Sequence, residues 1–177
     1  MPITPGCAQR SPFAGDAGYG YCPSKSRYYW GMRLVLMSDR HGVPVGYDLT
    51  PAGEREYEPA FRLAQAHPGT TLFADKGLWG AEYARTLELI DIHLVTPDKH
   101  RLSERPASEV EKARIRLVIE SVFANLKRQM RLEHHLAKTL PGLAQRIAQR
   151  LLALTLGMLV NTLLGRKPRS LVAYDRR

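Results

Sequence analysis

Short apolar runs alternate with a helical pattern in the middle of the chain, and this alternation limits the fold more than any other feature. Thr71 to Ala74 and Ile92 to Thr96 are brief apolar runs typical of buried strands. Between them Ala81, Ala84 and Leu87 recur at helical spacing. Strands joined through a helix pair in parallel within one sheet. The segment therefore predicts an α/β fold.

A second pair of strands is expected before this unit. Tyr28 to Met37 is apolar on both alternating faces apart from Arg33, as expected of a strand near the centre of a sheet. Pro44 to Thr50 follows a short turn, so the two segments should pair as a hairpin. A short helix near Pro59 should follow. Because a hairpin is antiparallel and a crossover is parallel, the predicted sheet is mixed.

Two long helices are expected in the second half of the chain. The first should run from Ser108 to about Leu132 and pack an apolar stripe on the sheet, formed by Val118, Val122, Leu126 and Met130. Pro141-Gly142 should separate it from the second, which should run from Leu143 to about Leu164. The second half of this last helix is apolar nearly all round, which predicts that it is buried. Its apolar run is shorter than the roughly 18 residues of a membrane span, so no membrane partner is expected.

The length and the cysteine content bound the organisation and the compartment. A chain of 177 residues fits one domain, which we expect over residues 1–165, followed by a basic tail over residues 166–177. Two cysteines make no disulfide framework, and the first residues lack the order of a signal peptide. The cytoplasm is the expected compartment.

Positive charge is concentrated in the second half of the chain. Residues 98–177 hold 17 Lys and Arg against 7 Asp and Glu, which gives +10, whereas residues 1–97 hold 9 against 10, which gives −1. Such an excess attracts a polyanion, most commonly DNA or RNA. A solvated helix surface explains the charge equally well.

Two groups of residues could carry chemistry. Asp75 stands at the carboxyl end of a predicted parallel strand, where α/β sheets place reactive groups, although Asp before Gly is also common in turns. Lys76 beside it could contact phosphate. On the first long helix, Arg116, Glu120 and Lys127 are four and seven residues apart and share one face. An Arg116–Glu120 salt bridge in solvent is the simpler interpretation of this spacing.

Together, Asp75 and Glu120 form a carboxylate pair of the kind that binds Mg²⁺ or Mn²⁺. A basic surface around such a pair suggests phosphodiester chemistry, in which two metals activate the attacking oxygen and stabilise the leaving oxygen. Lys127 and Arg128 are further candidates for phosphate contact.

These residues resemble the motifs of DDE-type insertion-sequence transposases. Phe73-Ala-Asp75-Lys-Gly77 resembles the second catalytic motif of that family. The third motif reads Tyr-x2-Arg-x3-Glu-x6-Lys, and Arg116, Glu120 and Lys127 match it, with Ala113 at the tyrosine position. The resemblance extends from Pro2 to about Leu164. It implies an RNase H-like mixed sheet flanked by helices, Mg²⁺ or Mn²⁺ as cofactor, and DNA at the transposon ends as partner. A homodimer is a further candidate assembly.

The resemblance also implies an aspartate on the central first strand, just before a Pro-Ile or Pro-Val pair. Pro2-Ile3 looks like that pair, so the aspartate would precede Met1 and most of the first strand would be missing. We therefore expect this chain to be a truncated and inactive copy of the catalytic domain. The alternatives are a non-catalytic DNA-binding remnant or regulator, and an RNase H-like nuclease.

Aromatic residues near the N-terminus interleave with cations. The aromatic residues are Tyr19, Tyr21, Tyr28, Tyr29 and Trp30, and the cations are Lys25 and Arg27. Their rings could stack on the bases of a single strand. Packing in the core with a polar tip in water is the favoured interpretation for most of them.

Overall fold

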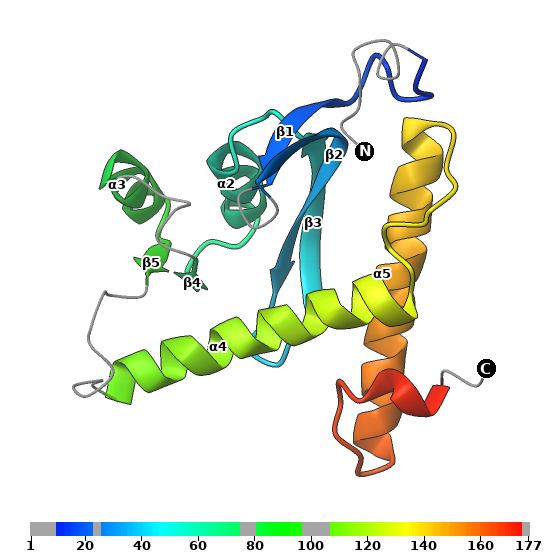
Figure 1. Cartoon of the computed structure of the whole chain (residues 1–177). Coiled ribbons are helices and arrows are strands. Elements are labelled where there is room, and N and C mark those ends of the chain that lie inside the picture. The colour runs from blue at the N-terminus through cyan, green and yellow to red at the C-terminus, as the bar shows by residue number, and fades with distance from the viewer. Residues whose placement is uncertain (1–9, 23–25, 75–80, 97–106, 175–177) are drawn as a thin grey trace.

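The computed structural model describes residues 10–22, 26–74, 81–96 and 107–174. These residues form the mixed α/β fold that the sequence predicts, with strands and short helices on one side and two long crossing helices on the other (Figure 1). The predictions for Asp75 and Lys76 fall outside the described residues.

The first sheet is antiparallel and has three strands. β1 (Gly18–Cys22), β2 (Arg27–Ser38) and β3 (Pro44–Pro51) lie in the order β1-β2-β3, so β2 is central and the predicted hairpin is confirmed. The Asp39 carboxylate closes the β2–β3 turn by accepting hydrogen bonds from the backbone of His41 and Val43. Gly42 in this turn has a φ of +92°, and a Cβ there would lie 2.9 Å from the side chain of Val122. The turn can therefore approach the long helix closely only because residue 42 is glycine.

The second sheet confirms the predicted crossover. β4 (Thr71–Phe73) and β5 (His93–Val95) pair in parallel, and α3 (Ala81–Leu89) connects them. α2 (Tyr57–Gln65) precedes β4 and contacts β2 and β3. Ala64, Leu87 and Ile92 form a small buried cluster that joins α2 to this unit.

The strands form two sheets, whereas the sequence predicts one mixed sheet. Among the described residues no strand of the first sheet pairs with a strand of the second. β1 pairs with β2 only as far as Gly31, so the same edge of β2 over Met32–Ser38 has no described partner strand. The α/β class is therefore confirmed, and the RNase H-like arrangement stays a prediction.

The first long helix packs on the antiparallel sheet as expected. α4 (Ala107–Ala124) continues into a π-helical turn, η2 (Asn125–Gln129), where the Met130 amide donates to the Asn125 carbonyl at 3.1 Å. Val122 and Leu126 are completely buried. The sheet residues that pack against this core are Met32, Leu34, Leu36, Tyr47 and Leu49. The predicted apolar stripe is thus confirmed.

The last helix starts earlier than predicted. α5 spans Leu140–Leu163, and the hydroxyl of Thr139 caps it by accepting from the Gly142 amide at 3.2 Å. The interpretation of Pro141-Gly142 as a break is wrong, because proline in the first turn of a helix needs no backbone N–H donor.

The second half of α5 is buried on one side only, so the prediction of a buried end is wrong in part. Leu151, Leu154 and Met158 face the core. On the opposite side an apolar stripe is exposed, formed by Leu152, Leu156, Leu159, Val160, Leu163 and Leu164. By length and composition alone α5 could also span a membrane, which is weak evidence because core helices pass the same test.

The residues after α5 fold back onto it. Leu171, in the short helix η3 (Leu171–Tyr174), is buried in the main core and lies against Gly157. The buried Asn161 side chain donates to the carbonyls of Pro168 and Ser170 at 3.0 Å each, and accepts from the Tyr174 hydroxyl at 2.9 Å. Most of the predicted tail is therefore held against the domain, and the boundary at residue 165 stays a prediction.

Replacing Asn161 with alanine should destabilise the protein by about 2–4 kcal/mol, because the buried Asn161 side chain makes three hydrogen bonds to the C-terminal segment that the variant would lose. For a domain of this size each kcal/mol lowers the Tm by roughly 2–4 °C. Thermal unfolding followed by circular dichroism measures this shift. Thr162→Ala, at the adjacent exposed position, should change the Tm by less than about 2 °C. Equal shifts in the two variants would show that the Asn161 hydrogen bonds do not hold the C-terminal segment.

Candidate active site

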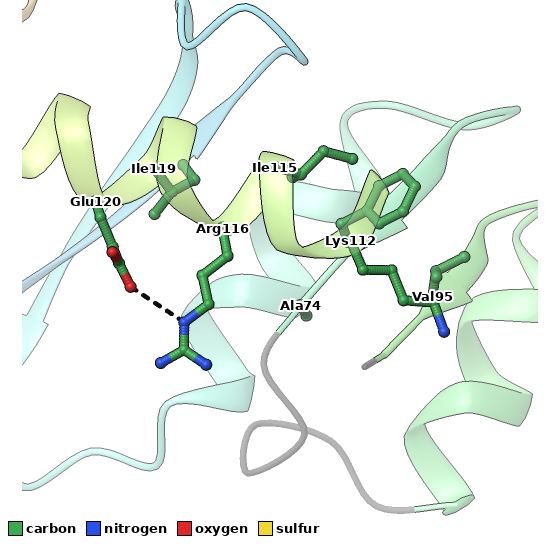
Figure 2. Close-up of a pocket in the computed structure, with 8 residues that line it drawn as sticks. Ala74, Val95, Lys112, Ile115, Arg116, Ile119 and Glu120 are labelled. Carbon is green, nitrogen blue, oxygen red and sulfur yellow. Dashed lines mark hydrogen bonds and ion pairs between the residues drawn. The ribbon is translucent and has the colours of Figure 1, made fainter. Parts of the chain in front are cut away.

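A cavity of about 300 Å³ lies between α4 and the carboxyl ends of β4 and β5 (Figure 2). Both strand ends and the middle of α4 supply its lining, which consists of Phe73, Ala74, Val95, Lys112, Ile115, Arg116, Ile119 and Glu120. The apolar part of the lining comes from the strand ends and the isoleucines. The charged part comes from one face of α4, because residues 112, 116 and 120 are one turn apart.

The strand end that precedes Asp75 forms one wall of this cavity. The Ala74 amide donates to the Val95 carbonyl at 3.1 Å, which ties the end of β4 to β5. Asp75 is the next residue, and its side chain lies outside the described residues. The carboxyl end of a parallel strand is where open α/β sheets place ligands. The fold thus brings the immediate neighbour of Asp75 into the same cavity as Glu120.

Glu120 and Arg116 interact on the exposed face of α4. Arg116 Nε donates to Glu120 Oε1 at 3.1 Å, and their side chains are 65% and 56% exposed. The salt bridge that the spacing suggests is therefore present, and the same two side chains line the cavity. Exposed pairs of this type contribute little to stability. The pair does orient the carboxylate, since it fixes one of its oxygens.

Lys112 also lines this cavity, although the sequence patterns did not identify it as a candidate site residue. It lies one helical turn before Arg116 and lines the cavity. The i, i+4 spacing of 112, 116 and 120 was the signal that could have found it. Two cations and one carboxylate along a helix face can bind a phosphate and a divalent metal side by side.

Lys127 and Arg128 lie further along the same helix and do not line the cavity. Lys127 Nζ forms an ion pair with Glu133 Oε1 at 3.3 Å, and both side chains are more than half exposed. Arg128 is exposed in the π-helical turn. These two cations are therefore available to a ligand on the surface rather than to one inside the cavity.

The donor set around the cavity fits a hard divalent cation. Carboxylate oxygens are the ligands that Mg²⁺ and Mn²⁺ prefer. Glu120 Oε1 is held by Arg116, and Glu120 Oε2 has no partner among the described residues. Within those residues no group of three acidic, histidine or cysteine side chains gathers. A metal ion bound by Glu120 would therefore need a further carboxylate ligand. Asp75, which directly follows Ala74 in the sequence, is the candidate.

A carboxylate and two cations on one face of α4 thus lie beside the carboxyl ends of two parallel strands, an arrangement that can bind a phosphate and a divalent cation. Residues 5–156 match the family model for the transposase DDE domain. The chain belongs to this family. Searches of curated proteins and of solved structures found no match.

Proposed function

We propose that this chain is the catalytic domain of a DNA transposase, the class of enzyme that cleaves and transfers DNA strands, and that its Asp75 and Glu120 hold Mg²⁺ or Mn²⁺. Family membership supports transposition chemistry in general, and the enzymes of this family use divalent metal ions. One structural observation carries the assignment of the site. The cavity brings Glu120 to the strand end that directly precedes Asp75.

The four charged residues of the proposed site have distinct roles. Asp75 and Glu120 supply carboxylate oxygens, and Arg116 holds Glu120 in position through Oε1. Lys112 and Arg116 bind the phosphate oxygens of the DNA, since cations on one helix face can contact one phosphate group. The metal, when bound, activates the attacking oxygen and stabilises the leaving oxygen.

The proposal also includes the RNase H-like arrangement of the family. In that arrangement one strand lies between the strands that correspond to β2 and β4. The edge of β2 over Met32–Ser38 has no partner strand among the described residues, which supports this arrangement, because a strand placed there would continue both sheets.

Metal-directed cutting of bound DNA tests the proposed function. Fe²⁺ can occupy sites built for Mg²⁺, and with ascorbate and peroxide it releases hydroxyl radicals that cut nearby DNA. We expect duplex DNA bound to the protein to be cut around one position, and Glu120→Gln to reduce the cutting by at least about tenfold, because it removes one anionic ligand. Glu111→Gln is the matched control, since Glu111 is exposed on the same helix outside the cavity. Equal cutting with both variants would show that the metal is held elsewhere.

We further propose that two copies of the chain pair through the exposed stripe of α5. Leu152, Leu156, Leu159 and Leu163 follow the 4-3-4 spacing that lets two helices interlock. The stripe exposes on the order of 600 Å² per copy, a large patch for a monomer, and pairing would bury on the order of 1,200 Å² in total. That area is near the lower limit for a stable dimer. No charged residue lies between Leu151 and Gly165, so the stripe itself adds no repulsion.

Analytical ultracentrifugation tests this pairing. The wild-type chain should be dimeric at micromolar concentration, and Leu156→Glu with Leu159→Glu should weaken dimerisation by more than about 100-fold, because two charges per copy would be buried. Leu89→Glu changes an even more exposed leucine, on α3, and should leave the dimer intact. A wild-type chain that stays monomeric at 100 µM would contradict the proposal.

A further inference from the structure

Four aromatic rings gather on one face of the β1–β2 ribbon. In the antiparallel register Tyr19 faces Trp30 and Tyr21 faces Tyr28, so the four side chains share one side. The rings of Tyr19 and Trp30 are 4.7 Å apart at 67°, and those of Tyr21 and Tyr28 are 5.0 Å apart at 56°. We name these four residues the aromatic face.

The opposite side of the ribbon is lined by glycine and packs on the chain after β3. A Cβ at Gly20 would lie 2.7 Å from the Ala52 carbonyl, and one at Gly18 would lie 3.2 Å from Pro51. A Cβ at Gly53 would lie 2.7 Å from the Tyr19 carbonyl. Such close approach is possible only without side chains. Because the glycine side is pressed against residues 51–53, the aromatic face points the other way.

The aromatic face is exposed, which corrects the prediction of core packing for most of these rings. Tyr28 is 69% exposed, Tyr21 47% and Tyr19 42%. Within each pair the rings meet edge to face or tilted, so each pair leaves a ring face uncovered by its partner. Arg27, the residue before Tyr28, is also exposed, but in the strand alternation it belongs to the opposite side of the ribbon.

We propose that the aromatic face binds unpaired DNA by stacking its bases. Exposed ring faces are the platforms on which the bases of a single strand stack, and this chain belongs to a family of proteins that act on DNA. Bases inside a duplex are already stacked on both faces, so the ligand is an unpaired strand. This inference rests on the proposed function only in that DNA is the ligand. A proline-rich peptide is the other ligand that such a face could take.

Matched oligonucleotides separate base stacking from phosphate contact. The probes are fluorescent dT12 and a 12-unit strand of the same charge that has abasic sites in place of the bases. We expect the wild-type chain to bind dT12 at least tenfold more tightly than the abasic strand. The double variant Tyr21→Leu/Tyr28→Leu should lose this preference and keep its affinity for the abasic strand. Tyr21→Phe/Tyr28→Phe keeps both rings and should retain the preference.

A second measurement does not depend on the double variants. The chain has two tryptophans, so Trp79→Phe leaves Trp30 as the only indole emitter. Saturating dT12 should quench or shift the Trp30 emission, and the abasic strand should not. Equal binding of both strands by the wild-type chain would overturn the inference, and so would an emission change on a proline-rich peptide with none on dT12. Because Glu120 lies outside the aromatic face, metal-directed cutting of duplex DNA would still test the proposed function independently.

Discussion

Raising the salt concentration from 50 to 200 mM should weaken duplex DNA binding by about 10³-fold or more, if six or more phosphates are neutralised. The basis is the excess of +10 over residues 98–177. Within the part of this half that the structure describes, nine of these cations are on exposed residues, namely Arg114, Arg116, Lys127, Arg128, Arg131, Lys138, Arg146, Arg166 and Lys167. The pKa of His135 is lowered by its burial and then by Arg150 and Arg146, which is consistent with a positive field in this half. Fluorescence anisotropy at several salt concentrations measures the slope.

Charge reversal identifies which cations contribute. Arg128→Glu should weaken binding to all sequences alike and reduce the salt slope, as the loss of a phosphate contact does. Lys127→Glu should act in the same direction and also place a second acid beside Glu133. The control is Arg85→Glu, an exposed arginine on α3 in the half without excess charge. An affinity that stays flat between 50 and 200 mM would mean that the basic surface serves only solubility.

Much of the fold could be predicted because local patterns coincide with the tertiary contacts. The apolar runs of β4 and β5 are short, and a helical pattern separates them, so parallel pairing followed from connectivity. Tyr28 to Met37 is apolar on both faces, and β2 is indeed central. Val122 and Leu126 lie where the 3.6-residue period places the buried stripe of α4.

The failures have tertiary causes. β1 was not predicted, because glycines alternate with tyrosines and glycine weakens a strand pattern. The glycines of β1 allow close contact with Ala52 and Gly53, and no local sequence pattern predicts this contact. The end of α5 is apolar all round, and hydrophobicity alone does not tell which side finds a neighbour. The chain covers the side of Leu154 and leaves that of Leu152 exposed.

The site could be predicted in part. The four-residue spacing placed Arg116 and Glu120 on one face, which the structure confirms. Lys127 was expected on that face as well; in the structure it lies in the π-helical turn, pairs with Glu133 and does not line the cavity, and its role stays a prediction. Ala74 lies beside the helix face of Glu120 because β4 packs next to α4. This packing is a tertiary property that no local sequence pattern predicts. Lys112 could have been placed on the face of Arg116 from its four-residue spacing, whereas its position in the cavity depends on this packing.

Replacing the two proposed metal ligands should strongly reduce the affinity of the protein for Mn²⁺. Two carboxylates should give a Mn²⁺ dissociation constant in the millimolar range, because few anionic ligands mean low affinity. The double variant Asp75→Asn/Glu120→Gln should weaken this binding by at least about tenfold, since the ligands keep their shape and lose their charge. Glu111→Gln should leave the affinity unchanged, because residue 111 lies on α4 outside the cavity.

We propose that Asp75 and Glu120 bind the same divalent metal ion. A Mn²⁺ titration of wild type and variants tests this directly. Electron paramagnetic resonance reports free Mn²⁺ as it is added to wild type, each single variant and the double variant. Either single variant should remove most of the Mn²⁺ binding, and the second substitution should reduce it little further, as expected of two ligands on one ion. Binding that persists unchanged in the double variant would contradict the account and place the metal elsewhere.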